Sequence, residues 1–409
     1  MQKVDTVPKH VFKFVHAYLR QTKMEKSRYP TFHSLNAARV CAEYCVVHYH
    51  IALEGNGLLK NKDGASALMC FFFVLSGFMA MHTNMDTDFS VVGAKSDYIY
   101  RRLQKVYPTY IIWILLDTPG NLVYWWDFAA GCPLFWMSIA SQPILLHAWL
   151  GSSHIGTTNG VSWYLCTLFW LWLVFPFVNV KTLFSARPWM SIICLYVLSI
   201  LTGVLMSGFY SVNSRELPII RLFEFLMGCC VAFTLDRPVN GWFVVLPLLC
   251  LFTYWVVTYT MPALWYIEDA PKAKLCQLWP RQQQQSIILN PTLLLSMFSV
   301  VFCLVIHWLA STERSGKGGF SMLQWDFFKS LSTFSLHIYL SHNAISTFLK
   351  FLFNQFGILS WWNTDTLMLA CYLIAYWYSK VEPKVLRWLG SFCHKDQAGQ
   401  QNHNPTDNI

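Results

Sequence analysis

Three ionisable side chains share one face of the first long apolar stretch of this chain. In an α-helix, Glu43 lies about 40° from Arg39 around the axis and His50 lies about 20° from it. Arg39 and Glu43 are four residues apart and can pair directly. His50 stands about 10 Å above Glu43, too far for a direct hydrogen bond, and His48 points to another side.

Charged groups inside an apolar span are costly and tend to be functional or paired. Arg39 could snorkel to the inner headgroups with Glu43 as its counter-ion, and His50 could be an ordinary interface histidine. A polar face three turns long nevertheless favours a functional cavity, in which the imidazole of His50 would perform acid–base chemistry.

A second polar face carries Ser335, Tyr339 and His342, at i, i+4 and i+7 of another apolar stretch, so a helix places them on one side. His342 is therefore a second candidate for acid–base work. Arg221 and Glu224 lie three residues apart in a third stretch. A structural intramembrane ion pair explains them at least as well as a catalytic role does.

Two basic residues, Arg102 and Lys105, stand three apart at the start of a further apolar stretch. Cytosolic basic residues in such a place usually fix orientation or contact lipid headgroups. They could equally hold the phosphates of a cytosolic substrate.

The composition explains why these groups must be positioned by membrane-spanning helices. Of the 409 residues, 55% are hydrophobic and only 12% are charged, about half the charged fraction usual in soluble domains. A soluble globular enzyme, a disordered chain and a small disulfide scaffold are all excluded on this ground. The sequence predicts an all-α, polytopic integral membrane protein.

Spans need about 20 mostly apolar residues. Ten candidates are expected at roughly 35–53, 64–82, 106–124, 161–180, 189–209, 216–235, 241–262, 286–310, 330–352 and 365–385. An eleventh stretch, 134–150, is interrupted by Pro133 and Pro143 and is polar for a span.

The distribution of basic residues indicates whether the stretch 134–150 crosses the membrane. If 134–150 does not cross and the N-terminus is cytosolic, 21 of the 30 Lys and Arg fall inside and 7 fall outside. If it crossed, every later loop would change sides and the bias would largely cancel. Ten spans with both termini cytosolic is therefore the expected topology, with 134–150 re-entrant or in the outer interface.

Three regions follow from this topology. Residues 1–34 are expected to form a cytosolic amphipathic segment along the inner membrane surface, residues 35–392 the transmembrane domain, and residues 393–409 a polar, disordered tail. Neither a metal site nor a nucleic-acid surface is expected, because the chain has no C-x-x-C pair with metal spacing and no basic stripe with interleaved aromatics.

Five motifs resemble those of the family-three membrane acyltransferases, in the same order. L-N-A-A-R-V-C-A-E-Y-C-V-V-H-Y-H (35–50) is similar to the first-span motif, which pairs Arg39 with His50. F-F-V-L-S-G-F (72–78) matches the second-span signature letter for letter. The other three are R-L-Q-K-V-Y-P (102–108), R-L-F-E-F-L-M-G (221–228) and S-L-H-I-Y-L-S-H (335–342).

This resemblance implies O-acyl transfer, commonly of acetyl, from cytosolic acyl-CoA to a hydroxyl of a carbohydrate, lipid or peptide. Arg39, Arg102, Lys105 and Tyr339 would hold the donor, acyl-CoA, with no metal. His50 would act as general base or carry the acyl group as a transient acyl-imidazole. The expected partners are thus acyl-CoA, a hydroxyl-bearing acceptor and membrane lipids.

The chain departs from the family pattern in two places. W-Y-L-C-T-L-F-W (163–170) lacks the Glu that many members carry there, and Glu43 occupies a position that is usually small and apolar. One hypothesis is that Glu43 enters the same cavity and compensates for the lost carboxylate. Glu43 and His342 accordingly join His50 as expected catalytic residues. Two alternatives stay open, a multi-span transporter and an inactive relative.

Overall fold

The computed structural model describes residues 31–52, 62–129, 133–150, 158–209, 216–236, 298–316, 325–356 and 364–401, together with residues 245 and 249. These ranges form helices and no strand, which confirms the all-α prediction. The long helices are α2 (His33–Ala52), α3 (Lys62–Thr83), α4 (Ala94–Ala129), α6 (Trp163–Val174), α8 (Pro188–Phe209), α9 (Pro218–Val231), α13 (Phe298–Arg314), α14 (Asp326–Gln355) and α15 (Thr364–Gln401). The short elements are α5 (Pro133–Ser141), α7 (Val180–Phe184) and the 3₁₀ turns η1 (His147–Leu150) and η2 (Phe175–Phe177).

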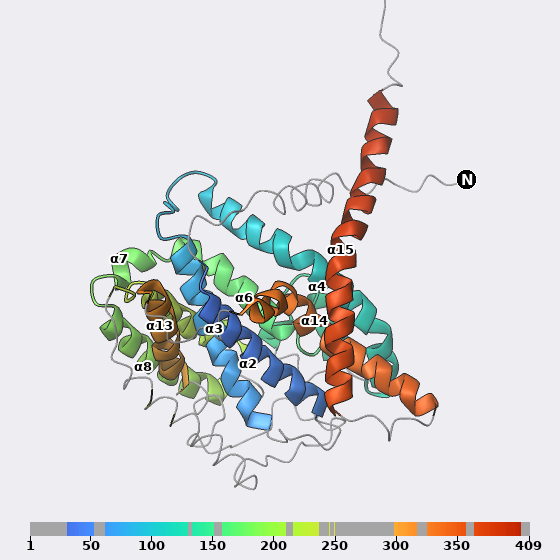
Figure 1. The fold of residues 1–409 in the computed structure, drawn as a ribbon, viewed down its shortest axis with the longest axis horizontal. Coiled ribbons are helices and arrows are strands. Elements are labelled where there is room, and N and C mark those ends of the chain that lie inside the picture. Colours follow the sequence, from blue (N-terminus) through green and yellow to red (C-terminus); the bar gives the residue numbers. More distant parts are fainter. Residues whose placement is uncertain are drawn as a thin grey trace, which may run out of the picture.

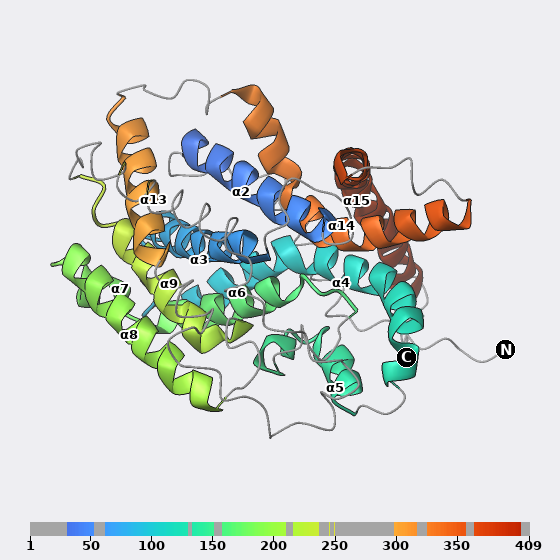
Figure 2. The same ribbon diagram turned by 90° about the horizontal axis from the view of Figure 1, so that it is seen from below.

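The helices pack in two groups around one apolar interior (Figure 1, Figure 2). In the first group, α3 lies along α9, with α8 and α13 against this pair. In the second group, α2 lies along α14, and α4 and α15 also pack on α14. Contacts of α2 with α3 and with α13 join the two groups.

α2 and α14 run in the same direction. Near their starts, Arg39 Nη2 donates to the carbonyl oxygen of Ser332 at 2.9 Å. Near the far end of α2, Lys350 Nζ donates to the carbonyl oxygen of Ile51 at 3.4 Å. Two helices are parallel across a membrane only when an odd number of spans separates them. The seven spans expected between α2 and α14 meet this condition, whereas counting 134–150 as an eighth would not.

The stretch from α5 to η1 is folded as a short broken element. A nine-residue helix rises about 13 Å, less than half of a bilayer core of about 30 Å. The carbonyl of Leu145, a residue with φ of 56°, accepts hydrogen bonds from Cys166 Sγ (2.9 Å) and Trp170 Nε1 (2.8 Å) of α6. Tyr110 of α4 donates to the Gln142 carbonyl at 2.7 Å. The described residues 133–150 therefore contain no continuous helix long enough for a bilayer core, and whether the stretch crosses stays a prediction.

By length and composition, one helix of the described part is long and apolar enough to cross a membrane, over Pro188–Leu205 of α8. Two shorter apolar helices cover Ala67–Thr83 and Trp163–Phe177. The polar faces of α2 and α14 lower their mean hydropathy, and Pro176 follows the twelve residues of α6. The count of ten spans stays a prediction.

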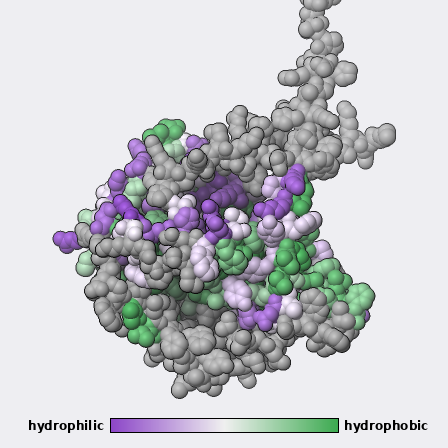
Figure 3. All heavy atoms as spheres, viewed as in Figure 1, coloured by the Kyte–Doolittle hydropathy of each residue, from purple (hydrophilic) through white to green (hydrophobic). Residues whose placement is uncertain are grey.

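Several expected regions lie outside the described residues. These are residues 1–30 of the amphipathic segment, nearly all of the span at 241–262 and the first part of the span at 286–310. At the other end, α15 continues to Gln401, past the expected start of the tail at residue 393, and residues 402–409 are not among those described. In Figure 1, α15 projects beyond the body on the side where α4 begins, and Figure 3 shows hydrophilic side chains gathered across the upper part of that face.

The seam between α3 and α9 depends on two glycines. A Cβ on Gly77 would lie 1.8 Å from the carbonyl oxygen of Phe225, and one on Gly228 would lie 1.9 Å from that of Val74. Small residues let membrane helices approach closely, so the two backbones pack directly against each other here.

The same seam encloses the Arg221–Glu224 pair. Arg221 Nη1 donates to both carboxylate oxygens of Glu224, at 2.7 and 2.9 Å, and both side chains are buried. Cys70 Sγ accepts from the same nitrogen at 3.4 Å, and Ser299 of α13 donates to Glu224 at 3.3 Å. This arrangement supports the structural interpretation of the pair, since its partners belong to the α3–α9–α13 packing.

Replacing either glycine of the seam with alanine should destabilise the protein strongly. The backbones of α3 and α9 would have to separate, so we expect a loss of about 3 kcal/mol or more and a lower thermal midpoint in detergent. Gly120→Ala on α4 is the matched control, because a Cβ there meets no atom within 4 Å. Equal midpoints for Gly77→Ala, Gly228→Ala and Gly120→Ala would contradict the direct contact.

Candidate active site

Two histidines meet where α2 lies along α14. The ring centroids of His50 and His342 are 5.3 Å apart, with an angle of 42° between the ring planes. The sequence placed each residue on the polar face of its own helix, but it did not place the two faces against each other. The structure therefore brings two of the expected catalytic residues into one site.

The hydrogen bonding of His342 fixes its chemistry. The side chain is fully buried, and Nδ1 lies 3.1 Å from the carbonyl oxygen of Ile338. A carbonyl oxygen can only accept, so Nδ1 carries the proton and Nε2 of the neutral ring carries the lone pair. Nε2 has no hydrogen-bond partner among the described residues. His342 is thus oriented to accept a proton at Nε2.

Tyr339 ties this turn of α14 to the chain before α6. Its hydroxyl donates to the carbonyl oxygen of Val161, and its ring centroid lies 5.5 Å from that of Tyr164 and 6.2 Å from that of His342. The Tyr164 hydroxyl is 3.3 Å from Ser76 Oγ. Tyr339 therefore borders the histidine pair, with its hydroxyl directed to the backbone.

Arg39 and Glu43 do not form the direct pair that their spacing allows. Arg39 bonds to the Ser332 carbonyl, while Glu43, which is 3% exposed, accepts a hydrogen bond from the hydroxyl of Ser335. The two charges still interact electrostatically. Each side chain has a partner on α14 within reach, and these contacts join the two helices.

The start of α2 is held by a side chain from α13. The carboxylate of Glu313 accepts from the backbone N–H of His33 at 2.8 Å and from that of Ser34 at 2.9 Å, and the Ser34 hydroxyl donates to it at 2.6 Å. A carboxylate at a helix N-terminus satisfies free N–H groups and complements the helix dipole. This contact fixes the position of the helix that carries His50.

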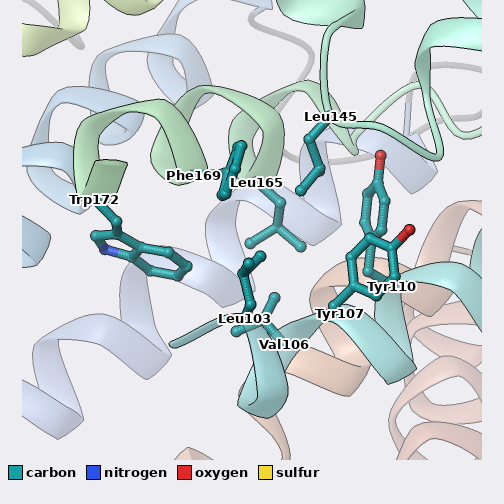
Figure 4. A pocket seen from close by; sticks show the side chains of 8 residues that line it. All are labelled: Leu103, Val106, Tyr107, Tyr110, Leu145, Leu165, Phe169 and Trp172. Atoms are coloured by element: carbon teal, nitrogen blue, oxygen red, sulfur yellow. The ribbon is translucent and has the colours of Figure 1, made fainter. Parts of the chain in front are cut away.

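The expected donor-binding residues Arg102 and Lys105 lie on α4, whereas the two histidines lie on α2 and α14. The guanidinium of Arg102 stacks 4.8 Å from the ring centroid of Tyr98 and 5.2 Å from that of Trp172, and Lys105 is exposed. The Trp172 indole also borders a small hollow between α4, Leu145 and α6, shown in Figure 4. The hollow is lined by Leu103, Val106, Tyr107, Tyr110, Leu145, Leu165, Phe169 and Trp172.

Two buried carboxylates near the site were missed by the sequence analysis. Glu216 is fully buried and interacts electrostatically with Tyr339, and its backbone carbonyl accepts from Thr167 of α6 at 2.6 Å. Asp117 of α4 is 4% exposed. Each could have been found from the sequence, because Glu216 lies in the apolar stretch 216–235 and Asp117 in the apolar stretch 106–124. The same criterion, a carboxylate inside an apolar stretch, identified Glu43.

The 163–170 stretch lacks the glutamate expected there from the family resemblance, so Glu216 and Glu43 are the carboxylates to compare with it. The carboxylate of Glu216 interacts electrostatically with Cys166 of α6. Glu43 accepts a hydrogen bond from Ser335, which lies one turn before Tyr339 on α14. Within the part of the chain that the structure describes, no group of three or more His, Cys, Asp and Glu side chains is arranged to hold a metal ion.

The fold and the site define a class of protein, an all-helical protein in which buried His342 and half-buried His50 meet between two packed helices. A family model described as an acyltransferase domain, of acyltransferase family 3, matches residues 32–380 of the 409. The chain belongs to this family, which confirms the resemblance found in its motifs. Members are typically integral membrane proteins. No curated protein and no solved structure matches the chain.

Glu43→Gln tests the role of the α2 carboxylate. Glutamine keeps a carbonyl oxygen for the Ser335 hydroxyl but removes the ionisable carboxyl group next to Arg39. We expect acyl-transfer activity to fall about tenfold, equivalent to about 1.4 kcal/mol, in protein that is inserted normally. Cys41→Ser, at an exposed position of the same helix, is the control. Unchanged activity in Glu43→Gln would remove Glu43 from the site.

Proposed function

We propose that this protein is a membrane-embedded O-acyltransferase that moves an acyl group, commonly acetyl, from cytosolic acyl-CoA to a hydroxyl of a carbohydrate, lipid or peptide. The observation that carries the proposal is the meeting of His50 and His342 at 5.3 Å between their ring centroids. It is supported by His342 Nε2, which has no hydrogen-bond partner in the described part of the chain, because acyl transfer to a hydroxyl requires a group that removes the hydroxyl proton.

In the direct route, an imidazole of the pair takes the proton of the acceptor hydroxyl while the oxygen attacks the thioester carbonyl carbon. The C–S bond then breaks, and the CoA thiolate leaves with the proton from the imidazolium. In the alternative route, the His50 imidazole attacks the thioester first and carries the acyl group, and His342 assists the acceptor hydroxyl in the second step. Both routes end in an ester and free CoA.

The donor would bind at the start of α4. Arg102 and Lys105 supply positive charge for the CoA phosphates, and Arg102 is oriented by its stacking on Tyr98 and Trp172. The small apolar hollow next to Trp172 lies beside this end of α4. Arg39, which bonds to the start of α14, would hold α2 and α14 together beside the donor. Tyr339 would contact the acyl group of acyl-CoA.

Family membership favours acyl transfer over the transporter hypothesis. The inactive-relative hypothesis is disfavoured because Arg39, His50, Tyr339 and His342 are all present and lie around one α2–α14 interface. For the setting, we propose a multi-pass membrane protein with both termini in the cytosol, so that Arg102 and Lys105 face the compartment that contains acyl-CoA.

The histidine pair gives the first test of this function. In membranes containing the full chain, His50→Ala and His342→Ala should each lower acceptor-dependent CoA release from acetyl-CoA about 100-fold or more. His337→Ala is the matched control, since His337 lies on α14 but directs Nδ1 toward Glu382, 3.5 Å away. Normal CoA release in both variants would refute the assignment. Labelled acyl group retained on His342→Ala but not on His50→Ala would select the acyl-imidazole route.

The basic residues of α4 give the second test. Neutralising Arg102 or Lys105 as glutamine should raise KM for acyl-CoA about tenfold and change kcat little, because a phosphate contact is present in both the ground and transition states. Arg101→Gln removes the same charge from an exposed neighbour that bonds back to the Asp97 carbonyl at 3.3 Å. An equal rise in KM for Arg101→Gln would show that net charge, and not these two positions, attracts the donor.

A further inference from the structure

A buried carboxylate outside the histidine pair joins three helices. Thr109 Oγ1 of α4 donates to Glu382 Oε1 of α15 at 2.7 Å, and both residues are 2% exposed. His337 Nδ1 of α14 lies 3.5 Å from Glu382 Oε2, at the limit of a hydrogen bond. The shorter contact, which we call the Thr109–Glu382 bond, therefore connects α4 directly to α15.

A proline interrupts each helix beside this bond. Pro108 directly precedes Thr109 inside α4, and Pro383 directly follows Glu382 inside α15. A proline has no N–H for the carbonyl four residues before it, and its ring clashes with that carbonyl, so a helix bends most readily there. The Thr109–Glu382 bond thus joins two points at which the helices can bend.

The part of α4 before Pro108 carries the proposed donor site and packs on α6. Its Arg102 guanidinium stacks on the indole of Trp172 in α6. The ring of Tyr98 lies 5.3 Å from that of Phe175, which directly follows α6. Since α6 packs on α9, this part of α4 is attached to the first helix group.

The part of α4 beyond Pro108 packs instead on α14 and α15. The ring of Trp113 lies 5.0 Å from that of Tyr378 in α15, and the side chain of Asn343 in α14 interacts with the Asp117 carboxylate. Pro108 is therefore a hinge point between the donor-binding part of α4 and the part attached to the second helix group.

Contacts near the histidine pair hold α15 on α14. The ring of Phe334 lies 5.3 Å from that of Tyr376, and Cys371 Sγ donates to the carbonyl oxygen of His342 at 3.8 Å. Figure 2 shows α4, α14 and α15 together on one side of the molecule. Because α15 is fixed on α14, a bond from α15 to α4 also fixes α4 relative to the helix that carries His342.

We propose that Glu382 is a positioning residue that holds the hinge point at Pro108 through its bond to Thr109. The hinge point sets the direction of the turns that carry Arg102 and Lys105, so that an acyl group bound there reaches the histidine pair. The inference rests on the proposed function, because it concerns the donor site defined there. Thr109 lies about 10 Å along α4 from Arg102, so Glu382 acts through α4 and not through the donor itself.

A pair of apolar replacements tests this role. In Thr109→Val/Glu382→Met, both partners are exchanged for apolar groups of similar shape, which can be nearly neutral for stability. With the full chain in lipid nanodiscs, we expect kcat for CoA release from acetyl-CoA to fall about tenfold or more and KM to change by less than about twofold. The donor-binding side chains are intact, but the thioester is displaced from the histidines. Methyl glucoside, glycerol mono-oleate and a serine peptide serve as acceptors, one from each proposed class.

Two further variants separate positioning from a general structural role. Thr109→Ser keeps the hydroxyl and should retain the wild-type kcat. Ser379→Ala is the matched control on α15, because the Ser379 hydroxyl bonds to the Tyr376 carbonyl of its own helix. A merely structural bond would lower the thermal midpoint of the double variant and leave kcat of the folded protein unchanged. Thr109→Val alone takes the place of the double variant if the latter fails to fold.

Amide hydrogen exchange tests the position of α4 without any turnover. Loss of the Thr109–Glu382 bond should raise exchange about tenfold in peptides that cover residues 95–107, compared with wild type and Thr109→Ser. Peptides from α3 should exchange equally in all three proteins, since α3 lies in the other helix group.

The outcomes separate this inference from the proposed function. Wild-type kcat in the folded double variant, an equal loss of kcat in Thr109→Ser, or unchanged exchange at the start of α4 would each overturn the positioning role. If the wild-type chain releases no CoA, the proposed function fails, and amide exchange alone decides whether Glu382 holds α4. CoA release that needs His342 but survives loss of the bond would support the function and reject the positioning role.

Discussion

The interior of this protein offers few hydrogen-bond partners beyond those that the helices bring to each other, and the arrangement of α2 on α14 follows from this constraint. Arg39 bonds to the backbone of α14, Glu43 accepts from Ser335, and Lys350 reaches back to the end of α2. A rotation or slip of either helix would break these contacts, and the buried carboxyl of Glu43 would lose its partner at a cost of about 1–3 kcal/mol. The same register sets His50 against His342.

The remaining helices support this pair from two sides. Glu313 of α13 caps the first turn of α2, which fixes where that helix starts. The glycine contacts of α3 and α9 let the two helices pack closely and enclose the Arg221–Glu224 pair, so an ion pair that could have been catalytic is instead part of the scaffold. On the other side, Tyr339 and Asn159 attach α14 to the chain before α6.

α4 carries the basic residues of the proposed donor site and packs on α14. Arg102 and Lys105 lie in its first half and Asp117 lies farther along, after Pro108. In the broken stretch from α5 to η1, Gln142 and His147 both contact the hydroxyl of Ser162, just before α6. The interruption of this stretch by prolines and polar residues, which made it a poor membrane span, is what allows its backbone and side chains to bond to α4 and α6.

The amino-acid sequence by itself determined the all-α class, the family and the polar faces of α2 and α14, because helical periodicity and short motifs are local properties. It also indicated that 134–150 is no ordinary span, since charge bias and proline positions are visible in the residues. Only the tertiary structure decided that the faces of His50 and His342 meet, that Arg39 and Glu43 bond to α14, and that Asp117, Gln142, His147 and Asn159 gather beside them. Those contacts join residues up to about 300 positions apart, and the pairing of helices depends on packing and hydrogen-bond satisfaction across the whole interior, which no local pattern records.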